Sequence, residues 1–298
     1  EQCVIKPDGL TGGKGVKVQG EHFKTKKEAL EYCNEVLQTH PYVIVEERLE
    51  GEEFSLQCLT DGKTVTAMPP VQDHKRAYLN DFGPNTGGMG AYSCEDHLLP
   101  FLTKNDIEDG FKMTQKVASA IYKETGEFYK GIMYAGLIVT KYGVKLLEYN
   151  ARFGDPEAMN VLPLMETDFV EVCNAIINQH LHKIKIKFQN KATVCKYVVP
   201  EGYPDAPIKD KKVEIGTIPR SGKIYYASVE QKKDGLYSTT SRAIACLGIA
   251  DNLEKAERIA EETTSSIKGR LFHREDIGTK KLIEKRIRHI REIKNENI

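Results

Sequence analysis

Apolar residues along this chain recur with two different periods. Runs of strand length, alternating or continuous, lie at residues 3–6, 16–18, 42–46, 54–59, 63–68, 133–139 and 146–150. Residues 25–38 and 103–125 instead carry apolar positions every three or four residues, which is the spacing of a helix with one buried face. Strands and helices therefore share the chain, and the pattern predicts an α/β (α+β) fold.

The last third of the chain is richer in strands. Strand patterns occur at residues 192–199, 213–215, 223–229 and 239–247, with glycine-containing turns between them. Asn252 is placed to cap a helix that runs to about residue 267, and a charged helix closes the chain. This part contains no compact set of acid, base and nucleophile. We expect a second domain there that supports or covers a site formed elsewhere.

Two other helix starts are marked by capping residues. Thr25 and Glu28 form the pattern of a capping box, and the helix that follows is expected to bury Leu30, Cys33 and Leu37. Asp168, next to Thr167, is expected to cap a further helix.

Composition and charge narrow the classes of protein. At 298 residues the chain has room for about two domains, and its 43 basic and 43 acidic residues give no reason to expect a nucleic-acid partner. Seven scattered cysteines without a CxxC pair predict reduced thiols in a cytoplasmic protein. No apolar run reaches the ~18 residues of a membrane span. The chain opens inside a strand-like run without an initiator Met, so we expect it to be the later part of a longer protein.

Candidate chemistry begins with the strand at residues 146–150. Side chains alternate along a strand, so Glu148 and Asn150 face the same way, and Arg152 follows with the same spacing. Oxygen ligands at this spacing suit a hard cation such as Mg²⁺, and a guanidinium suits a carboxylate or phosphate. The alternative for these three residues alone is an edge strand with a solvated polar face.

The loop at residues 8–15 is rich in glycine and lies between two short strands. Its glycines allow backbone N–H groups to surround an anion, and lysines stand on both sides of them. It is not a P-loop, because Asp8 replaces the first glycine and Gly15 replaces the serine or threonine. A phosphate-covering flap and a plain hairpin turn both remain open.

Two further segments are polar. The acids at residues 46–53 are typical of a solvated hinge, although a strand edge there could also bind an adenine. The long segment at residues 72–90 contains apolar residues such as Ala77, Phe82 and Met89, so we expect an ordered substrate loop rather than disorder. His74 within it, taken alone, is expected at the surface.

Three stretches of the sequence together resemble one enzyme family. They are VIKPDGLTGGKGV (4–16), QDHKRAYLNDFGPNTGGMGAY (72–92) and LLEYNARFGDPE (146–157). They are similar to the signatures of glycinamide ribonucleotide synthetases, also called phosphoribosylamine–glycine ligases, which are ATP-grasp enzymes of purine biosynthesis. The similarity extends to YAGLIVT (134–140) and HREDIG (273–278) near the end of the chain. Three ordered motifs at compatible distances are far more specific than one glycine-rich loop.

The resemblance implies an ATP-grasp fold with three parts. Residues 1–46 correspond to a small lid subdomain, residues 47–188 to a larger core with the metal and substrate site, and residues 189–298 to a β-rich C-terminal domain. The family also has an N-terminal domain ahead of the lid, and we expect that upstream domain to belong to the same protein as these residues.

The resemblance also implies roles for individual residues. Lys6 and Arg152 are the catalytic residues it suggests, with Lys6 and the loop residues Gly12, Gly13, Lys14 and Gly15 on the phosphates of ATP. Glu46, Glu47 and Leu49 frame the adenine, and Glu53 binds the ribose. Glu148 and Asn150 hold Mg²⁺ or Mn²⁺. The acceptor pocket is lined by Asp73, Lys75, Arg76, Gly87, Gly88, Arg152 and Asp155.

The sequence departs from the wider superfamily at one point. A second metal-binding acid often stands on the preceding strand, but that strand reads Tyr134-Ala135-Gly136 here. Further metal ligands therefore stay open.

The reaction implied by the family joins glycine to 5-phosphoribosylamine through glycyl phosphate, with ATP as co-substrate. The alternatives are another ATP-grasp carboxylate–amine ligase or carboxylase, and a non-catalytic nucleotide-binding module. The PNTGGMGAY stretch counts against the first alternative, and the presence of Lys6, Glu148, Asn150 and Arg152 together counts against the second.

Overall fold

A computed structural model describes residues 2–9 and 15–295 of the chain. Contacts divide the chain into two compact units, Glu1–Glu50 (unit 1) and Gly51–Ile298 (unit 2). We describe each unit separately. No helix in the described ranges combines the length and the apolar composition that crossing a membrane requires.

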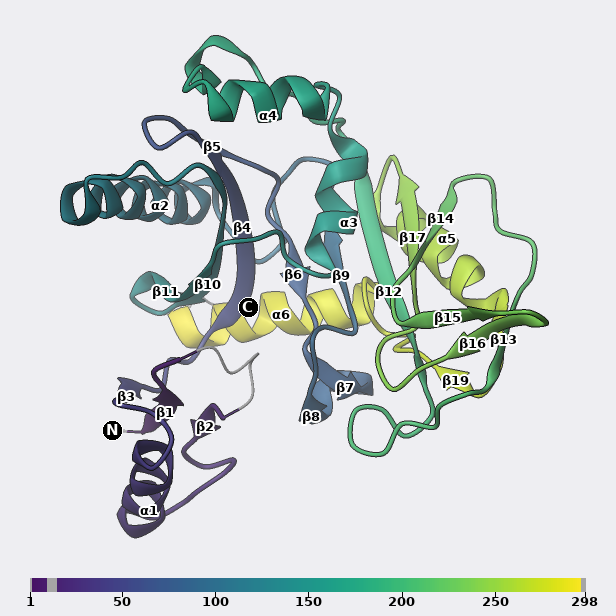
Figure 1. Cartoon of the computed structure of the whole chain (residues 1–298), viewed down its shortest axis with the longest axis horizontal. Coiled ribbons are helices and arrows are strands. Elements are labelled where there is room, and N and C mark those ends of the chain that lie inside the picture. Colours follow the sequence, from purple (N-terminus) through teal and green to yellow (C-terminus); the bar gives the residue numbers. More distant parts are fainter. Residues whose placement is uncertain (1, 10–14, 296–298) are drawn as a thin grey trace. The chain divides into compact units, whose positions relative to one another are not determined.

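Unit 1 is a small antiparallel sheet with one helix (Figure 1). The strand order is β2-β1-β3, and Ile5 on β1, together with Phe23, Tyr32 and Val36, forms its core. The strands are β1 (Cys3–Pro7), β2 (Lys17–Val18) and β3 (Val43–Glu47), and the helix is α1 (Lys26–Leu37).

The capping box of α1 is confirmed. Of the three residues predicted to be buried, Cys33 is half-buried and packs against the core of unit 1, but the prediction was wrong for Leu30 and Leu37. Thr25 accepts from the backbone N–H of Glu28, and the Glu28 carboxylate accepts from the backbone N–H of Thr25. Tyr32 and Val36, four residues apart, are the buried residues of the helix, whereas Leu30 and Leu37 are 55% and 49% exposed. The stripe that contains Tyr32 and Val36 faces the core cluster of unit 1, so the two leucines lie outside it.

Unit 2 contains a first sheet in the order β11-β10-β4-β5, covered by a long helix. The strands are β4 (Glu52–Thr60), β5 (Val65–Ala67), β10 (Gly131–Thr140) and β11 (Gly143–Asn150), and the helix is α2 (Lys104–Thr125). Gly110 of α2 lies against Leu137 of β10, where an added Cβ would come within 2.6 Å of a leucine methyl group. This close approach seats α2 on the sheet. The hairpin β10–β11 carries the LLEYN stretch at its edge.

A second sheet joins residues that are far apart in sequence. Its order is β14-β17-β12-β9-β6, and β19 pairs with the end of β12. Strand β9 pairs antiparallel with β12, with Ala91 opposite Cys195. The members are β6 (Gln72–Asp73), β9 (Gly90–Ser93), β12 (Ala192–Pro200), β14 (Gly222–Tyr226), β17 (Ile244–Ala250) and β19 (Leu271–Phe272). The expected core and C-terminal regions thus share one sheet and one contact unit. Their division at residue 188 stays a prediction.

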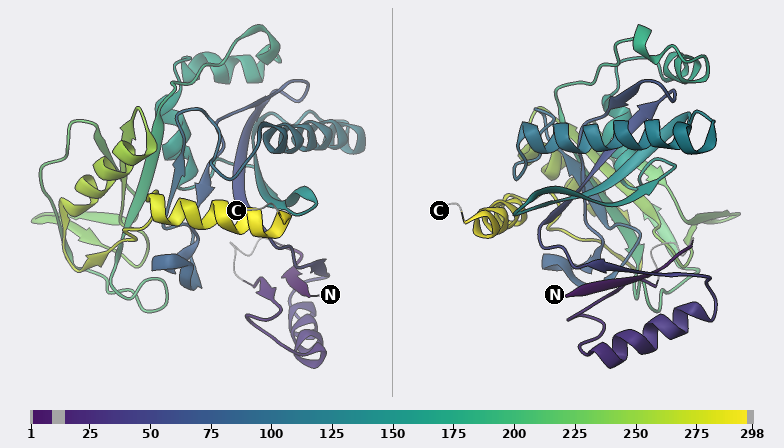
Figure 2. Two further views of the ribbon diagram at one scale, coloured as in Figure 1. Left: turned by 180° about the vertical axis from the view of Figure 1, so that it is seen from behind. Right: turned by 90° about the vertical axis from the view of Figure 1, so that its left-hand side faces the viewer.

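The remaining elements are short strands and helices around these sheets (Figures 1 and 2). Helix α5 packs against β12, β14 and β17, and α3 packs against β9 and β12. The remaining strands and helices are β7 (Arg76–Tyr78), β8 (Phe82–Asn85), β13 (Lys212–Ile215), β15 (Val229–Lys232), β16 (Gly235–Ser238), β18 (Ile267–Lys268), η1 (Leu79–Asp81), η2 (Leu162–Leu164), η3 (Leu181–Lys183), α3 (Glu157–Val161), α4 (Phe169–Ile177), α5 (Leu253–Ser265) and α6 (Lys280–Lys294).

Two expectations from the pattern gain detail here. The segment at residues 72–90 is ordered, as expected, and contains the short strands β6, β7 and β8. The strand expected at residues 223–229 corresponds to β14, which ends at Tyr226, and to the first residue of β15. The strand expected at residues 239–247 corresponds to β17, which begins only at Ile244, while β16 ends before residue 239. Asn252 and Asp168 accept hydrogen bonds from the backbone N–H groups of Lys255 and Glu171, so both predicted helix caps are confirmed.

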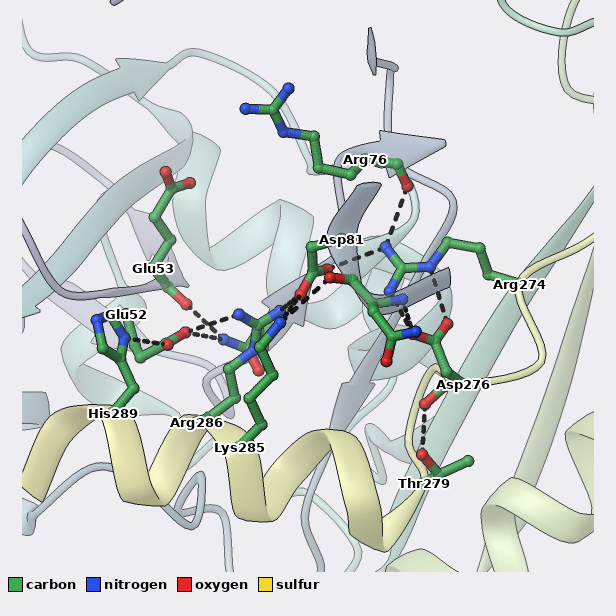
Figure 3. A network of polar contacts seen from close by, with 12 residues as sticks. Glu52, Glu53, Arg76, Asp81, Arg274, Asp276, Thr279, Lys285, Arg286 and His289 are labelled. Carbon is green, nitrogen blue, oxygen red and sulfur yellow. Dashed lines mark hydrogen bonds and ion pairs between the residues drawn. The ribbon is translucent and has the colours of Figure 1, made fainter. Parts of the chain in front are cut away.

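A charged network holds α6 against the rest of unit 2 (Figure 3). Arg286 of α6 lies 2.6 Å from Asp81 and 3.3 Å from Glu52 at the start of β4. Arg274, only 1% exposed, contacts Asp81 and Asp276 and also donates to the carbonyl of Arg76. The network therefore anchors the backbone of residues 76–81, which directly follows predicted substrate residues.

Candidate active site

Strand β11 places the two predicted metal ligands beside each other. Asn150 Nδ2 donates to Glu148 Oε1 over 3.1 Å. Gly136 of β10 pairs with Glu148, and Leu137 pairs with Leu146, so Leu147 is an extra residue in the ladder. A bulge of this kind bends a strand and redirects its side chains. Arg152, exposed after the strand, donates to the carbonyl of Phe153 over 2.8 Å.

The donor set of Glu148 and Asn150 fits a hard divalent cation. One carboxylate and one amide oxygen are the oxygen ligands that Mg²⁺ takes from protein when substrate phosphates supply others. Among the described residues, no group of three or more His, Cys, Asp or Glu is placed to hold a metal by itself. The geometry therefore suits an ion that is shared with a bound phosphate rather than enclosed by protein.

Lys75 links three of the predicted site residues. Its ammonium lies 3.1 Å from the Glu53 carboxylate, which is the main cause of a raised Lys75 pKa. The charges of Asp73 and Glu148 raise that pKa further. Lys75 is therefore close enough to Glu53, Asp73 and Glu148 for their charges to act on it, although these residues were predicted for ribose, acceptor and metal binding. With these charges around it, Lys75 stays protonated at neutral pH.

Asp73 lies in a buried, carboxylate-rich environment. Its Oδ1 is buried, and no described residue donates a hydrogen bond to it. Burial raises the Asp73 pKa well above its ordinary value, and the nearby Glu157 carboxylate raises it further. Glu157 is 2% exposed and accepts a hydrogen bond from Tyr134 over 2.7 Å. The half-buried Asp73 stands beside the turn at residues 87–88, where a Cβ on Gly88 would lie 2.7 Å from Asp73 Oδ1.

Asp155 is held by residues from the C-terminal part of unit 2. Tyr197 donates to its Oδ1 and Arg242 to its Oδ2, each over 2.7 Å. Arg242 also donates to the carbonyls of Gly87 and Gly88 over 2.7 and 2.9 Å. Residues 87, 88 and 155 are therefore brought together. We call Asp73, Lys75, Gly87, Gly88 and Asp155 the acceptor cluster.

Arg76 is placed differently from the acceptor cluster. Its guanidinium donates to the carbonyl of Gly83 over 3.0 Å, across the β7–β8 hairpin. A cavity of about 460 Å³, lined by Lys63, Tyr122 and Phe128 among others, shares no residue with the predicted site.

His74 is buried, against the expectation of a surface histidine. It is 2% exposed, and neither ring nitrogen has a hydrogen-bond partner among the described residues. Burial lowers its pKa from 6.5 to about 3, and the charges of Arg286 and Arg274 lower it further. His74 is therefore neutral at physiological pH, with its ring packed near Tyr92.

In unit 1 the structure pairs Lys6 with Glu46, so the predicted phosphate and adenine residues form a salt bridge. Glu47 is exposed at the end of β3, and Leu49 is half-buried two residues later. Gly15 accepts a hydrogen bond from Tyr32 over 2.5 Å. The predicted phosphate residues Gly12, Gly13 and Lys14 lie outside the described residues.

Four residues of the site were missed from the sequence. Glu157 stands inside the LLEYNARFGDPE stretch, and Tyr134 precedes Ala135-Gly136, so both were within recognised motifs. Tyr197 and Arg242 had no local signal, because their partners are 42 and 87 residues away from them in sequence.

Comparison with protein families gives two matches. The model of the phosphoribosylglycinamide synthetase ATP-grasp (A) domain matches residues 1–158, and that of the C domain of the same enzyme matches residues 193–280. A phosphoribosylamine–glycine ligase of Methanosarcina acetivorans is 50% identical over 98% of this chain and 66% of its own length. One of Methanothermobacter thermautotrophicus is also 50% identical, over 99% and 68%. The chain thus spans about two thirds of the length of these curated relatives.

The chain is also similar in structure to solved proteins of the same fold. The phosphoribosylamine–glycine ligase of Thermotoga maritima is 31% identical, with a TM-score of 0.78, over 92% of this chain and 68% of that one. The biotin carboxylase domain of 2-oxoglutarate carboxylase from Hydrogenobacter thermophilus has a TM-score of 0.67 at 16% identity, over 98% and 61%. At that identity the second likeness concerns the fold alone, which is the predicted ATP-grasp fold of mixed helices and strands.

Proposed function

The chain belongs to the phosphoribosylglycinamide synthetase family, and on that premise we propose that it is an ATP-dependent ligase of purine biosynthesis. It joins glycine to 5-phosphoribosylamine and forms glycinamide ribonucleotide, ADP and phosphate. One observation supports this proposal most. Within unit 2, Glu53 and Glu148 lie near Lys75, which belongs to the acceptor cluster. We also propose that it acts in the cytoplasm.

The reaction proceeds in two chemical steps. A glycine carboxylate oxygen attacks the γ-phosphorus of ATP, ADP leaves, and glycyl phosphate forms. The amine nitrogen of phosphoribosylamine then attacks the glycyl carbonyl carbon, the C–N bond forms, phosphate leaves and a proton is released. Phosphate leaves far more readily than oxide, which is why the carboxylate must be phosphorylated first.

The chain's own residues bind, orient and neutralise charge, which is most of what phosphoryl transfer requires of a protein. Lys6 contacts the ATP phosphates, and Arg152 neutralises charge on the transferring group. Glu148 and Asn150 hold Mg²⁺ or Mn²⁺, which supplies positive charge at phosphate oxygens when bound. The loop residues Gly12, Gly13, Lys14 and Gly15 complete the phosphate contacts, Glu46, Glu47 and Leu49 frame the adenine, and Glu53 binds the ribose.

The acceptor cluster binds glycine and the amine in this proposal, together with Arg76, Arg152 and the buried acid Glu157. Its charges suit these substrates. The protonated Lys75 and the exposed Arg152 attract a carboxylate, whereas Oδ1 of Asp73, which has no partner among the described residues, is available to accept a hydrogen bond from an amine. Residues 1–46, 47–188 and 189–298 are proposed as the lid, the core and the C-terminal domain.

Omission of single substrates tests the proposal. Phosphate release is measured with Mg-ATP, glycine and phosphoribosylamine, and then with each omitted or replaced by bicarbonate, alanine or another amine. Release that requires glycine supports the ligase. Release that depends on bicarbonate instead identifies a carboxylase, and ATP binding by calorimetry without any release identifies a nucleotide-binding module.

Hydroxylamine supplies a second readout that does not need phosphoribosylamine. It attacks an acyl phosphate and gives a hydroxamate and phosphate, so glycyl phosphate is detected as glycine hydroxamate. ATP-dependent formation of glycine hydroxamate is the expected result, and its absence from folded, ATP-binding protein contradicts the glycyl phosphate step.

A further inference from the structure

Arg242 lies in the connection between β16 and β17, far in sequence from every motif of the site. Its side chain is 15% exposed. One terminal nitrogen donates to the carbonyls of Gly87, Gly88 and Asp155, at 2.7, 2.9 and 3.3 Å. The other terminal nitrogen donates to the Asp155 carboxylate. One guanidinium thus bridges two segments that are 155 and 87 residues away from it along the chain.

Tyr197 supports this arrangement from the neighbouring strand β12. The Arg242 guanidinium lies 4.5 Å from the centre of the Tyr197 ring, a distance at which a cation and an aromatic ring attract each other. The Tyr197 hydroxyl donates to the Asp155 oxygen that Arg242 does not contact. Both carboxylate oxygens of Asp155 therefore accept a hydrogen bond from the C-terminal part of unit 2, and the carboxylate has a fixed orientation.

The turn at residues 87–88 is also held through the residues that flank it. Thr86 donates from its backbone N–H and its hydroxyl to the carbonyl of Lys75, over 2.7 and 2.8 Å. Met89 donates from its backbone N–H to the carbonyl of His74. The turn is therefore tied to His74 and Lys75 through its flanking residues and to Arg242 through its own carbonyls.

We propose that Arg242 is a positioning residue for glycine activation, an inference that rests on the proposed ligase function. Its planar fork fixes the turn at residues 87–88 and the Asp155 carboxylate together, and so sets the shape of the acceptor cluster. Asp155 is consequently held in one orientation within the cluster. A lysine keeps the charge of Arg242 but lacks the fork that reaches several acceptors at once.

The expected effect follows from the contacts that are lost. Hydrogen bonds to charged groups contribute enough that removing one changes an equilibrium by about tenfold or more, and misplacing a reacting group by about 1 Å costs on the order of 100-fold. We expect the use of glycine to weaken and the use of ATP to stay unchanged. The reason is that, in the part of the chain that the structure describes, Arg242 contacts residues of the acceptor cluster and none of the residues predicted to bind ATP.

The test measures KM for glycine, KM for ATP and kcat by glycine hydroxamate formation. For Arg242→Met we expect the glycine KM to rise by about tenfold or more while the ATP KM stays within about twofold. Arg242→Lys is expected to recover only part of the loss, and added guanidinium chloride at tens of millimolar is expected to improve glycine use by Arg242→Ala. Tyr197→Phe removes one hydrogen bond to an Asp155 carboxylate that Arg242 still holds, so we expect a smaller rise in the glycine KM, of about threefold.

Matched controls separate positioning from folding. Arg258→Met on α5 removes an exposed arginine and should leave all three parameters unchanged. Wild-type glycine KM in folded Arg242→Met overturns the inference, as does an equal change in the ATP and glycine KM values. If Arg242→Met does not fold, unchanged glycine KM in both Arg242→Lys and Tyr197→Phe overturns it. Failure of the wild-type chain to form any hydroxamate contradicts the proposed function itself.

Discussion

The side-chain amide of Asn150 donates a hydrogen bond to the Glu148 carboxylate over 3.1 Å. This contact orients the carboxylate and leaves the amide oxygen of Asn150 available as a ligand. Both side chains extend from the end of β11, beside the bulge at Leu147, so they are fixed relative to the sheet and not to a loop.

Replacing Glu148 should stop metal-dependent phosphoryl transfer and leave the fold intact. Glu148 is exposed, and its loss removes a ligand without opening a cavity. We expect Glu148→Ala to lower ADP formation by at least about 100-fold with an unchanged melting temperature. Lys145→Ala, also exposed on β11, is the control and should keep wild-type turnover. Near-normal ADP formation by folded Glu148→Ala would remove Glu148 from the proposed site.

Replacing Lys6 should weaken the use of ATP more than the use of glycine. Lys6 is paired with Glu46 on β3 and is proposed to meet ATP phosphates. We expect Lys6→Ala to raise the ATP KM or lower kcat by about tenfold or more, with glycine KM within about twofold. Lys26→Ala, which removes an exposed lysine of α1, should change neither. Unchanged ATP kinetics would favour a plain hairpin at residues 8–15.

Adding one methyl group at Gly88 should disturb the acceptor cluster. Gly88 has φ +108°, and a Cβ there would lie 2.7 Å from Asp73 Oδ1 and 2.7 Å from a carbon of Pro156. We expect Gly88→Ala to raise the glycine KM by about tenfold or more. Gly143→Ala has a similar backbone strain, at φ +90°, but open space around the Cβ. It should lower stability by about 1 kcal/mol without changing glycine KM. Equal kinetics in the two variants would contradict the prediction.

His74 should make the protein sensitive to mild acid. Burial lowers its pKa from 6.5 to about 3, so the unfolded chain takes up a proton near pH 6.5 that the folded chain does not bind. Its contribution to stability is therefore complete above about pH 6.5 and is lost as pH falls toward 3, by up to about 1.4 kcal/mol per pH unit.

The His74 prediction is checked by urea unfolding between pH 7 and pH 5, above the ordinary pKa values of carboxyl groups. The carboxyl groups whose pKa burial raises, Asp73 and Glu52, are present in every variant compared, so the difference between curves reports on the histidine. We expect His74→Leu to unfold with a smaller loss of stability across this range than the wild-type chain. His182→Gln, at an exposed histidine, should follow the wild-type curve. Parallel curves for His74→Leu and the wild-type chain would show that His74 is not the titrating group.

Two arginines four residues apart should differ strongly in their effect on stability. Arg274 is 1% exposed and contacts Asp81 and Asp276, whereas Arg270 is 58% exposed and contacts Glu201. Arg274→Met leaves the partly buried carboxylates of Asp81 and Asp276 with fewer partners, and we expect it to lower the free energy of unfolding by about 3 kcal/mol. Arg270→Met should lower it by at most about 1 kcal/mol. Similar values for both would mean that the network around α6 contributes little.

Much of the local structure was predictable because its causes are local. The caps at Thr25, Asp168 and Asn252 depend on a side chain and a backbone N–H within three residues, so each was read from the sequence. The shared face of Glu148 and Asn150 follows from the alternation of one strand. The buried face of α1 was predicted correctly at Cys33 but wrongly at Leu30 and Leu37, because the choice between Leu30 and Tyr32 depends on what the helix packs against.

By itself, the sequence determined the mixed fold, because local periodicity of apolar residues distinguishes strands from helices. It also determined the family and the residues proposed for the chemistry, because these lie in three contiguous motifs. Only the tertiary structure decided which distant groups meet. It brought Arg242 and Tyr197 to Asp155, and it buried His74 within reach of the charges of Arg274 and Arg286, which follow much later in the sequence. Such contacts depend on pairing between strands as remote as β9 and β12, and no local pattern along the chain encodes that pairing.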